Sequence, residues 1–243
     1  MRAIQALLIT LSFIPALISC KKDSSHASKH CRIIAIYDTV YEASGARATV
    51  TRIFYDNDGR IAYQNIKWST DSAIRIFMYH DNSIIITSSN TRLSSDTVHL
   101  NSKGVPTLIK TGYSGPSSDS TSYSYDGAGL LTSSTSGNAY IKTTTTYTYD
   151  NGDCVKAVTS DGDVFIYTYY TDFTTRDGDP RMFEDIYDYG VPTVRNKHLI
   201  RSYQYGNYVW QYSYTFDNAG RIETVVNRTD TYVAVRRYEY DCE

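Results

Sequence analysis

An acidic segment, "DNDG" at residues 56–59, is the first place in this chain where residue types could do chemistry. It offers the carboxylate and amide oxygens that Ca²⁺ prefers as ligands. A helix–loop–helix calcium loop also needs glycine at its sixth position and a bidentate glutamate at its twelfth. Counted from Asp56, those positions hold Ile61 and Lys67, so the ligand set is incomplete. We expect no metal ion at this segment.

Zinc and hydrolase chemistry have equally incomplete signals. His26, His30 and Cys31 lie in a polar stretch without a nearby fourth ligand. The segment "GYSGP" at 112–116 does not match the G-x-S-x-G pattern of a nucleophile elbow. Paired carboxylates for glycoside cleavage are recognised by their spatial separation, which a sequence does not give. We expect no cofactor and no catalytic residue, with a glycan- or peptidoglycan-acting enzyme kept as a lesser alternative.

The acidic phrase recurs, and turn chemistry explains it. In "YDNDGRI" the carboxylate of Asp56 can accept backbone N–H groups of a type I turn, and Gly59 can take the positive φ of a bulge. This count places Tyr55 opposite Ile61 and Asp56 beside Arg60. The variant "YDNGDCV" predicts a two-residue Asn-Gly turn with its register shifted by one. The turn residues identified in this way are Asp56, Gly59, Asp126, Gly129, Asp150, Gly152, Asp217 and Gly220.

The spacing of the phrase predicts repeated hairpins. The aromatic or apolar residue before each turn is Tyr55, Tyr79, Leu100, Tyr125, Tyr149, Phe216 or Tyr240. Successive gaps are 24, 21, 25, 24, 67 and 24 residues. A unit of about 24 residues fits two strands of about eight residues and two turns. The long gap is close to three such units.

The strands before these turns alternate between aromatic and hydroxyl residues. The hydroxyl face carries Ser124, Thr148, Ser213 and Thr215. Such alternation indicates a sheet with one buried and one wet face, and we interpret the aromatic residues as the buried one. Exposed aromatic rows could instead stack on sugars or line a peptide groove. The aromatic face consists of Tyr55, Tyr123, Tyr125, Tyr147, Tyr149, Tyr212, Tyr214 and Phe216.

One segment lacks the hairpin rhythm, between residues 171 and 200. Within it, Asp179 can cap a helix, Pro180 suits the first helical position and Gly190 can end the helix. We predict a short helix near 180–189 that packs on the sheet.

The N-terminus has the features of an export signal. Arg2 precedes a mainly apolar stretch, and "LISC" at 17–20 resembles the lipobox of bacterial lipoproteins, whose cysteine is acylated. This resemblance implies a signal peptide at 1–19, lipidation at Cys20 and attachment to a membrane. We expect residues 20–30 to form a flexible tether and residues 31–243 a single β-repeat domain. Lys21 after the cysteine favours the outer membrane, by resemblance to Gram-negative sorting.

The phrases "YDNDGRI" and "FDNAGRI" resemble the YD repeats of the Rhs family, and "YDGAGLL" and "YDNGDCV" resemble them in part. Most of residues 31–243 is also similar to a group of bacterial envelope lipoproteins of unknown function. These share a lipobox, YD-like hairpins and a glycine- and proline-containing interruption, here "YGVPTVRNKHLIRSYQYG". The resemblance implies a β-repeat scaffold and brings no catalytic residue.

Composition sets further limits. The chain has 24 Lys and Arg against 26 Asp and Glu, so no basic surface for nucleic acid is indicated. Three cysteines remain besides Cys20, and either a Cys31–Cys242 bridge or three free thiols including Cys154 fits an exported protein.

We therefore predict an all-β antiparallel meander of 14–18 strands in a strongly twisted or curled sheet, open or closed. A transmembrane barrel is disfavoured, because the strands are rich in Tyr and Thr rather than Leu and Val. The expected function is a non-enzymatic envelope lipoprotein that binds a polysaccharide, another polymer or a protein. The main alternative is a carrier that encloses an apolar or lipid ligand.

Overall fold

The computed structural model describes residues 31–43, 45–89, 95–112, 119–179 and 188–242, so Cys20 and its neighbours lie outside the described residues. The described chain contains sixteen strands. They are β1 (Cys31–Glu42), β2 (Gly45–Tyr55), β3 (Ile61–Lys67), β4 (Ser72–His80), β5 (Ser83–Ser88), β6 (Ser95–Leu100), β7 (Pro106–Lys110), β8 (Ser120–Tyr125), β9 (Leu131–Gly137), β10 (Lys142–Asp150), β11 (Asp153–Thr159), β12 (Val164–Thr174), β13 (His198–Tyr205), β14 (Tyr208–Phe216), β15 (Ile222–Arg228) and β16 (Val233–Cys242).

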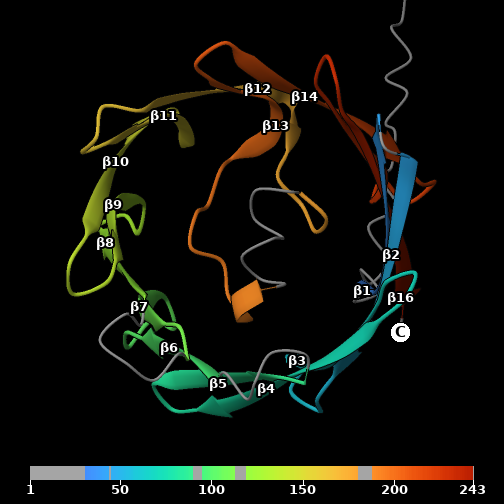
Figure 1. Ribbon diagram of the computed structural model, residues 1–243, viewed down its shortest axis with the longest axis horizontal. Helices are drawn as coiled ribbons and strands as arrows, with labels where there is room; N and C mark the ends of the chain where they lie inside the picture. Colours follow the sequence, from blue (N-terminus) through green and yellow to red (C-terminus); the bar gives the residue numbers. More distant parts are fainter. Residues whose placement is uncertain (1–30, 44, 90–94, 113–118, 180–187, 243) are drawn as a thin grey trace, which may run out of the picture.

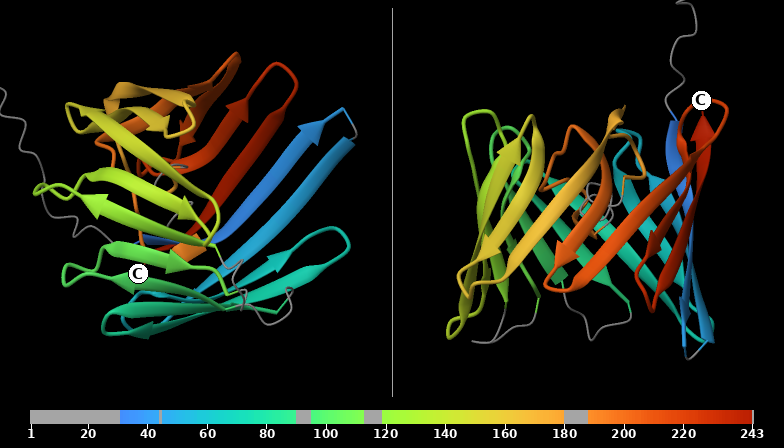
Figure 2. Two further views of the ribbon diagram at one scale, coloured as in Figure 1. Left: turned by 60° about the vertical axis from the view of Figure 1, so that its left-hand side comes forward. Right: turned by 90° about the horizontal axis from the view of Figure 1, so that it is seen from above.

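The strands form a closed barrel in chain order (Figure 1). Each strand pairs antiparallel with its sequence neighbours, which confirms the predicted meander. The sheet does not stay open and curled, because β1 pairs with β16 over ten residue pairs, from Cys31 with Cys242 to Tyr41 with Val233. Closure is the physical solution for a sheet this wide, since it removes both unpaired edges and hides one face. Figure 2 shows the strands tilted within the wall, as closure requires.

The repeated phrase forms turns at one end of the barrel, which we call the motif end. Asp56 Oδ1 accepts hydrogen bonds from the backbone N–H groups of Asp58 (3.0 Å) and Arg60 (2.9 Å). Gly59 has a φ of 79°, and Tyr55 pairs with Ile61 across a register shift, as in a bulged hairpin. The pairs Tyr125–Leu131 and Phe216–Ile222 repeat this geometry.

Two departures from the repeat have separate causes. Asn151 and Gly152 have φ values of 51° and 91°, so residues 150–153 make the two-residue turn that the sequence predicts. The long gap does not hold three units. It holds two hairpins and a connection at residues 175–197 between β12 and β13.

The aromatic face points into the barrel. Ser124, Thr148 and Ser213 on the opposite face are exposed, whereas Tyr123, Tyr147 and Tyr212 pack against buried side chains. Two apolar clusters lie on the inner face of the barrel, one around Ile33, Ile84 and Leu199 and one around Leu131, Cys154 and Ile200.

Several inward tyrosines donate their hydroxyl hydrogen bonds to backbone carbonyls of the neighbouring strand. The hydroxyl of Tyr55 on β2 donates to the carbonyl of Ile33 on β1 (2.7 Å). In the same way, Tyr214 on β14 donates to the carbonyl of Ile200 on β13 (2.8 Å). Burial raises the pKa of Tyr55 to about 12, so its hydroxyl stays a neutral donor. These bonds remove the cost of placing phenol groups in an apolar interior.

The connection at 175–197 enters the barrel, where Figure 1 shows its described second half inside the ring of strands. Its described parts reach different sides of the wall. Tyr238 donates to the carbonyl of Gly178 (2.8 Å), Asp188 pairs with Arg75 (2.7 Å), and Val194 packs in the cluster around Leu131. The helix predicted near 180–189 falls largely on residues 180–187, outside the described residues. No element of the described chain is a helix, although Asp188 and Tyr189 have helical conformation.

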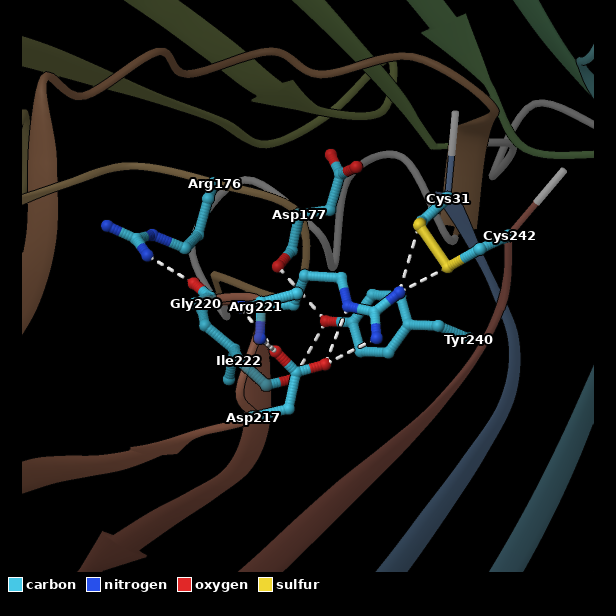
Figure 3. A network of polar contacts seen from close by, with 10 residues as sticks. Cys31, Arg176, Asp177, Asp217, Gly220, Arg221, Ile222, Tyr240 and Cys242 are labelled. Carbon is cyan, nitrogen blue, oxygen red and sulfur yellow. Dashed lines mark hydrogen bonds and ion pairs between the residues drawn. A yellow bond between two sulfur atoms is a disulfide. The ribbon is translucent and has the colours of Figure 1, made fainter. Parts of the chain in front are cut away.

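A disulfide and an arginine join the first and last strands (Figure 3). Cys31 and Cys242 form a disulfide, and Cys154 is buried and outside this bond. The guanidinium of Arg221 contacts both sulfur atoms, pairs with Asp217 (2.6 Å) and lies 4.8 Å from the ring centre of Tyr240. The turn between β14 and β15 is thereby attached to the β1–β16 seam.

The disulfide gives a first prediction. Replacing both cysteines (Cys31→Ser with Cys242→Ser) should lower the free energy of unfolding by about 2–5 kcal/mol, because the bond closes a loop spanning nearly the whole domain. Urea unfolding followed by tryptophan fluorescence measures this. Cys154→Ala, which keeps the bond, serves as the control for removing a thiol. An unchanged urea midpoint in the double variant would contradict the role of the bond.

The motif turns give a second prediction. Desolvation tends to raise the pKa of Asp217, but hydrogen bonds from Arg221 and Ala219 outweigh it and hold this pKa below its usual value. A carboxyl group whose pKa is lower in the folded state stabilises the fold at pH values above its unfolded-state pKa of about 3.9. This stabilisation is lost as the pH falls through the pKa of the folded state. Asp217→Asn should therefore cost about 0.5–1 kcal/mol at pH 7. The difference from the unsubstituted protein should shrink as acid protonates Asp217.

The matched control is Asp126→Asn. Asp126 accepts the same backbone hydrogen bond from Leu130 (2.9 Å), but Leu130 occupies the position that arginine holds in the other turn. An equal, pH-independent loss in both variants would show that the ion pair contributes nothing.

Candidate ligand site on the inner wall

The residues singled out in the sequence contribute to turns and to core packing. The turn aspartates bind backbone N–H groups at the motif end, and the eight predicted aromatic residues pack on the inner clusters rather than forming an exposed row. Within the described chain, no group of three or more His, Cys, Asp or Glu residues is placed to hold a metal ion. The lipidation position Cys20 lies outside the described residues.

A different aromatic group lies on the inner face of β12, β13 and β14, and we call it the aromatic platform. The register places Phe165 beside Tyr205 and Tyr205 beside Tyr208 in one row. A second row, one step further from the turns at 160–163 and 206–207, contains Tyr167, Tyr203 and Trp210. Six rings from three adjacent strands therefore share one face.

The rings contact one another closely. Tyr203 and Trp210 stack with centroids 4.4 Å apart, and Phe165 and Tyr205 stack at 4.9 Å. Tyr208 lies 6.0 Å from Trp210. Such contacts hold each ring through its neighbours, so the platform is preorganised rather than formed on binding.

The platform continues the cluster around Leu131, in which Tyr167 is buried, and becomes exposed toward Tyr208. Tyr208 is 66% exposed, while Phe165, Tyr203 and Trp210 are half-buried. The stacking covers the facing sides of Tyr203 and Trp210, so the ring surface left for a ligand is that of the exposed Tyr208 and the uncovered part of Trp210. The hydroxyl of Tyr205, which donates to Asp163 (3.1 Å), supplies a polar group in the same row.

The one histidine–carboxylate pair of the described chain is structural. Asp153 Oδ2 lies 2.6 Å from His198 Nδ1, and Asp153 Oδ1 accepts the backbone N–H groups of Lys197 and His198, both at 2.8 Å. Asn196 accepts the N–H of Cys154 (3.0 Å), and the Cys154 thiol contacts the carbonyl of Lys156 (3.7 Å). These contacts fasten the end of the inserted connection to the wall.

The outer wall carries both hydrophilic and apolar regions. On β8, β10 and β14 the exposed outward positions are Ser122, Ser124, Thr146, Thr148, Gln211, Ser213 and Thr215. Outward apolar side chains gather on β2–β4, where Phe54 and Tyr63 stack at 4.2 Å beside Ile74, Ile76 and Met78. A smaller group on β12 and β14 contains Val164, Ile166 and Val209. These patches do not form a continuous apolar band around the barrel.

The aromatic platform was missed because the sequence signal was weak. The segments "VFIYTYY" and "SYQYGNYVW" alternate like the other strands, and nothing in them distinguishes a packed tyrosine from a half-exposed one. The distinction depends on where the inserted connection fills the interior. A sequence signal that was available is the concentration of aromatic residues between 165 and 210.

Comparisons with known proteins place the fold but no family. No protein-family model matches the chain, and no curated protein matches it. Among solved structures, the chain is similar to a porin-like protein from Bacteroides uniformis, with a TM-score of 0.68 and 17% sequence identity. The likeness covers 86% of this chain and 98% of that protein, so the closed-barrel fold is shared. In the described residues no helix is long and apolar enough to span a membrane.

Proposed function

We propose that this chain is a non-catalytic cell-envelope protein whose barrel stands in water, is tethered through lipidated Cys20, and binds a saccharide polymer on the aromatic platform. The observation that carries the proposal is the preorganised set of six rings with Tyr208, Tyr203 and Trp210 accessible on the inner wall. Sugar rings present apolar C–H faces that stack on aromatic rings, and hydroxyl edges that hydrogen-bond to polar neighbours.

Placement in the envelope is supported by three features. The segment "LISC" resembles a lipobox, and the similar structure is described as porin-like. The Cys31–Cys242 bond fits an oxidising compartment outside the cytoplasm. By the resemblance of Lys21 to outer-membrane sorting, we place the anchor in the outer membrane.

A solute-conducting pore is the second candidate, because the fold is shared with a porin-like protein. Barrels that span an outer membrane turn an apolar band toward lipid and keep a polar interior. Here Ser124, Thr148 and Ser213 face outward and the largest apolar clusters face inward. The arrangement of faces therefore favours a barrel in water over a pore in lipid.

The carrier of an apolar ligand is also less favoured. A carrier needs apolar volume that its own side chains leave empty. Tyr189 and Val191 pack on the cluster around Ile84, and Val194 lies in the cluster around Leu131. The most apolar part of the described interior is thus occupied by the inserted connection.

A fluorescence titration tests saccharide binding. The chain has two tryptophans, so Trp68→Phe leaves Trp210 as the only emitter. Adding maltohexaose or an N-acetylglucosamine hexamer should shift or quench Trp210 emission in a saturable way. Tyr203→Ala, which removes the stacking partner, should weaken binding by about 1 kcal/mol, or roughly fivefold.

Phe54→Ala is the matched control, because it removes one ring of a stacked pair on the outer wall. It should leave the titration unchanged. No response of Trp210 to either oligosaccharide would contradict the platform as their binding site. Shorter products in the mixture, detected by mass spectrometry, would contradict a non-catalytic role.

A further inference from the structure

A groove on the outer wall carries two arginines without acidic partners. It has a volume of about 540 Å³ and crosses β12, β13, β14 and β15. Arg201 and Arg228 both line it. None of the ion pairs between described residues includes either arginine.

A β-bulge aims Arg201 into this groove. Thr168 pairs with Ser202 and Tyr169 pairs with Ile200, so Arg201 is the extra residue between two successive pairs. Strict alternation would turn Arg201 toward the interior, opposite to Ser202. The bulge places both side chains in the same groove, which is a recognised use of bulges at binding sites.

The floor of the groove is a row of hydrogen-bonding side chains. Thr168, Ser202, Gln211 and Arg228 follow one another across four strands by direct pairing. The hydroxyls of Thr168 and Ser202 are 2.7 Å apart and hold each other in place. The row ends at Arg228, so neutral hydroxyl and amide groups lie next to a fixed positive charge.

Arg201 is held at the other side of the groove. Its guanidinium carbon lies 5.8 Å from the ring centre of Tyr170, whose hydroxyl donates to the carbonyl of Tyr212 (2.9 Å). Arg201 and Arg228 belong to strands separated by β14, a spacing of roughly 10 Å between strand axes. Two long side chains at that spacing can converge on one anionic group.

We propose that this groove binds an acidic saccharide. A carboxylate or phosphate substituent would be held by Arg201 and Arg228, and sugar hydroxyls would bond to Thr168, Ser202 and Gln211. A neighbouring groove of about 460 Å³ shares Val209, Gln211 and Arg228 with the first. It extends to Tyr208 and Asp230, and because the Asp230 carboxylate would repel an anion, we place the charged substituent in the first groove.

Titration of the full-length protein with oligogalacturonate tests the proposal. The methyl-esterified oligomer is the matched neutral probe, since it keeps the sugar and loses the charge. We expect the charged oligomer to bind roughly tenfold more tightly, with affinity falling as salt rises. The double variant Arg201→Gln with Arg228→Gln should remove most of this preference, and Arg201→Lys should lose part of it, because lysine lacks the planar fork.

Arg237→Gln is the control, because Arg237 is also on the outer wall, over the ring of Tyr37, but outside the groove. It should bind oligogalacturonate like the unsubstituted protein. Trp210→Ala should leave the preference for the charged over the esterified oligomer unchanged, which separates the groove from the aromatic platform. Equal binding of the esterified oligomer, or an equal loss in the Arg237 variant, would overturn the proposal. Binding to phosphatidylglycerol vesicles through Arg201 and Arg228, without oligogalacturonate binding, would replace it with a lipid head-group site.

Discussion

The pairing of β1 with β16 is the contact on which the rest of this structure depends. Fourteen other strands each find both partners among their sequence neighbours, but β1 and β16 each find one of their two partners only across the whole length of the domain. Without this seam the aromatic face would be exposed along an open sheet with two unpaired edges. The Cys31–Cys242 bond, Arg221 and Tyr240 all lie at this seam. The turn between β14 and β15 therefore has a second role, because its Arg221 contacts the disulfide.

Local features of the fold were predictable because their causes are local. Turn chemistry specified by Asp56, Gly59 and the Asn151–Gly152 pair sets the hairpin registers, and alternation assigns Tyr123 and Ser124 to opposite faces. Closure was left undecided, because the number of strands and their tilt come from long-range pairing that no single segment encodes. The disulfide was likewise one of two alternatives until the seam placed both cysteines together.

The candidate sites were harder to predict than the fold. The platform needs β12, β13 and β14 side by side and also needs the inserted connection to fill a different part of the interior. The groove depends on a one-residue bulge at Arg201. Strict alternation of side chains along the strand would assign Arg201 to the inner face. In both cases the sequence shows the residue types, but it does not show that these residues lie together at an exposed surface.

The comparison with a porin-like protein sharpens the account of function. The two chains share a barrel fold at 17% identity. A barrel can be embedded in lipid or surrounded by water, depending on which residues face outward. In this chain hydroxyl residues such as Ser124 and Thr148 face outward beside apolar patches, and on the inward packing of the main clusters we propose a wall that stands in water. Binding surfaces are then available on both sides of the wall, the platform inside and the arginine groove outside.

The central claim is that the outer wall faces water, and site-specific labelling tests it most directly. Single cysteines at exposed wall positions, Ser124→Cys, Thr148→Cys and Ser213→Cys, can be reacted in native membranes with a water-soluble fluorescent maleimide. The native cysteines of the barrel give little background, since two are bonded and Cys154 is buried. The account predicts rapid labelling at all three positions and no quenching of the attached dye by brominated lipids. Slow labelling together with strong quenching by those lipids would show that the wall is embedded in the membrane and would contradict it.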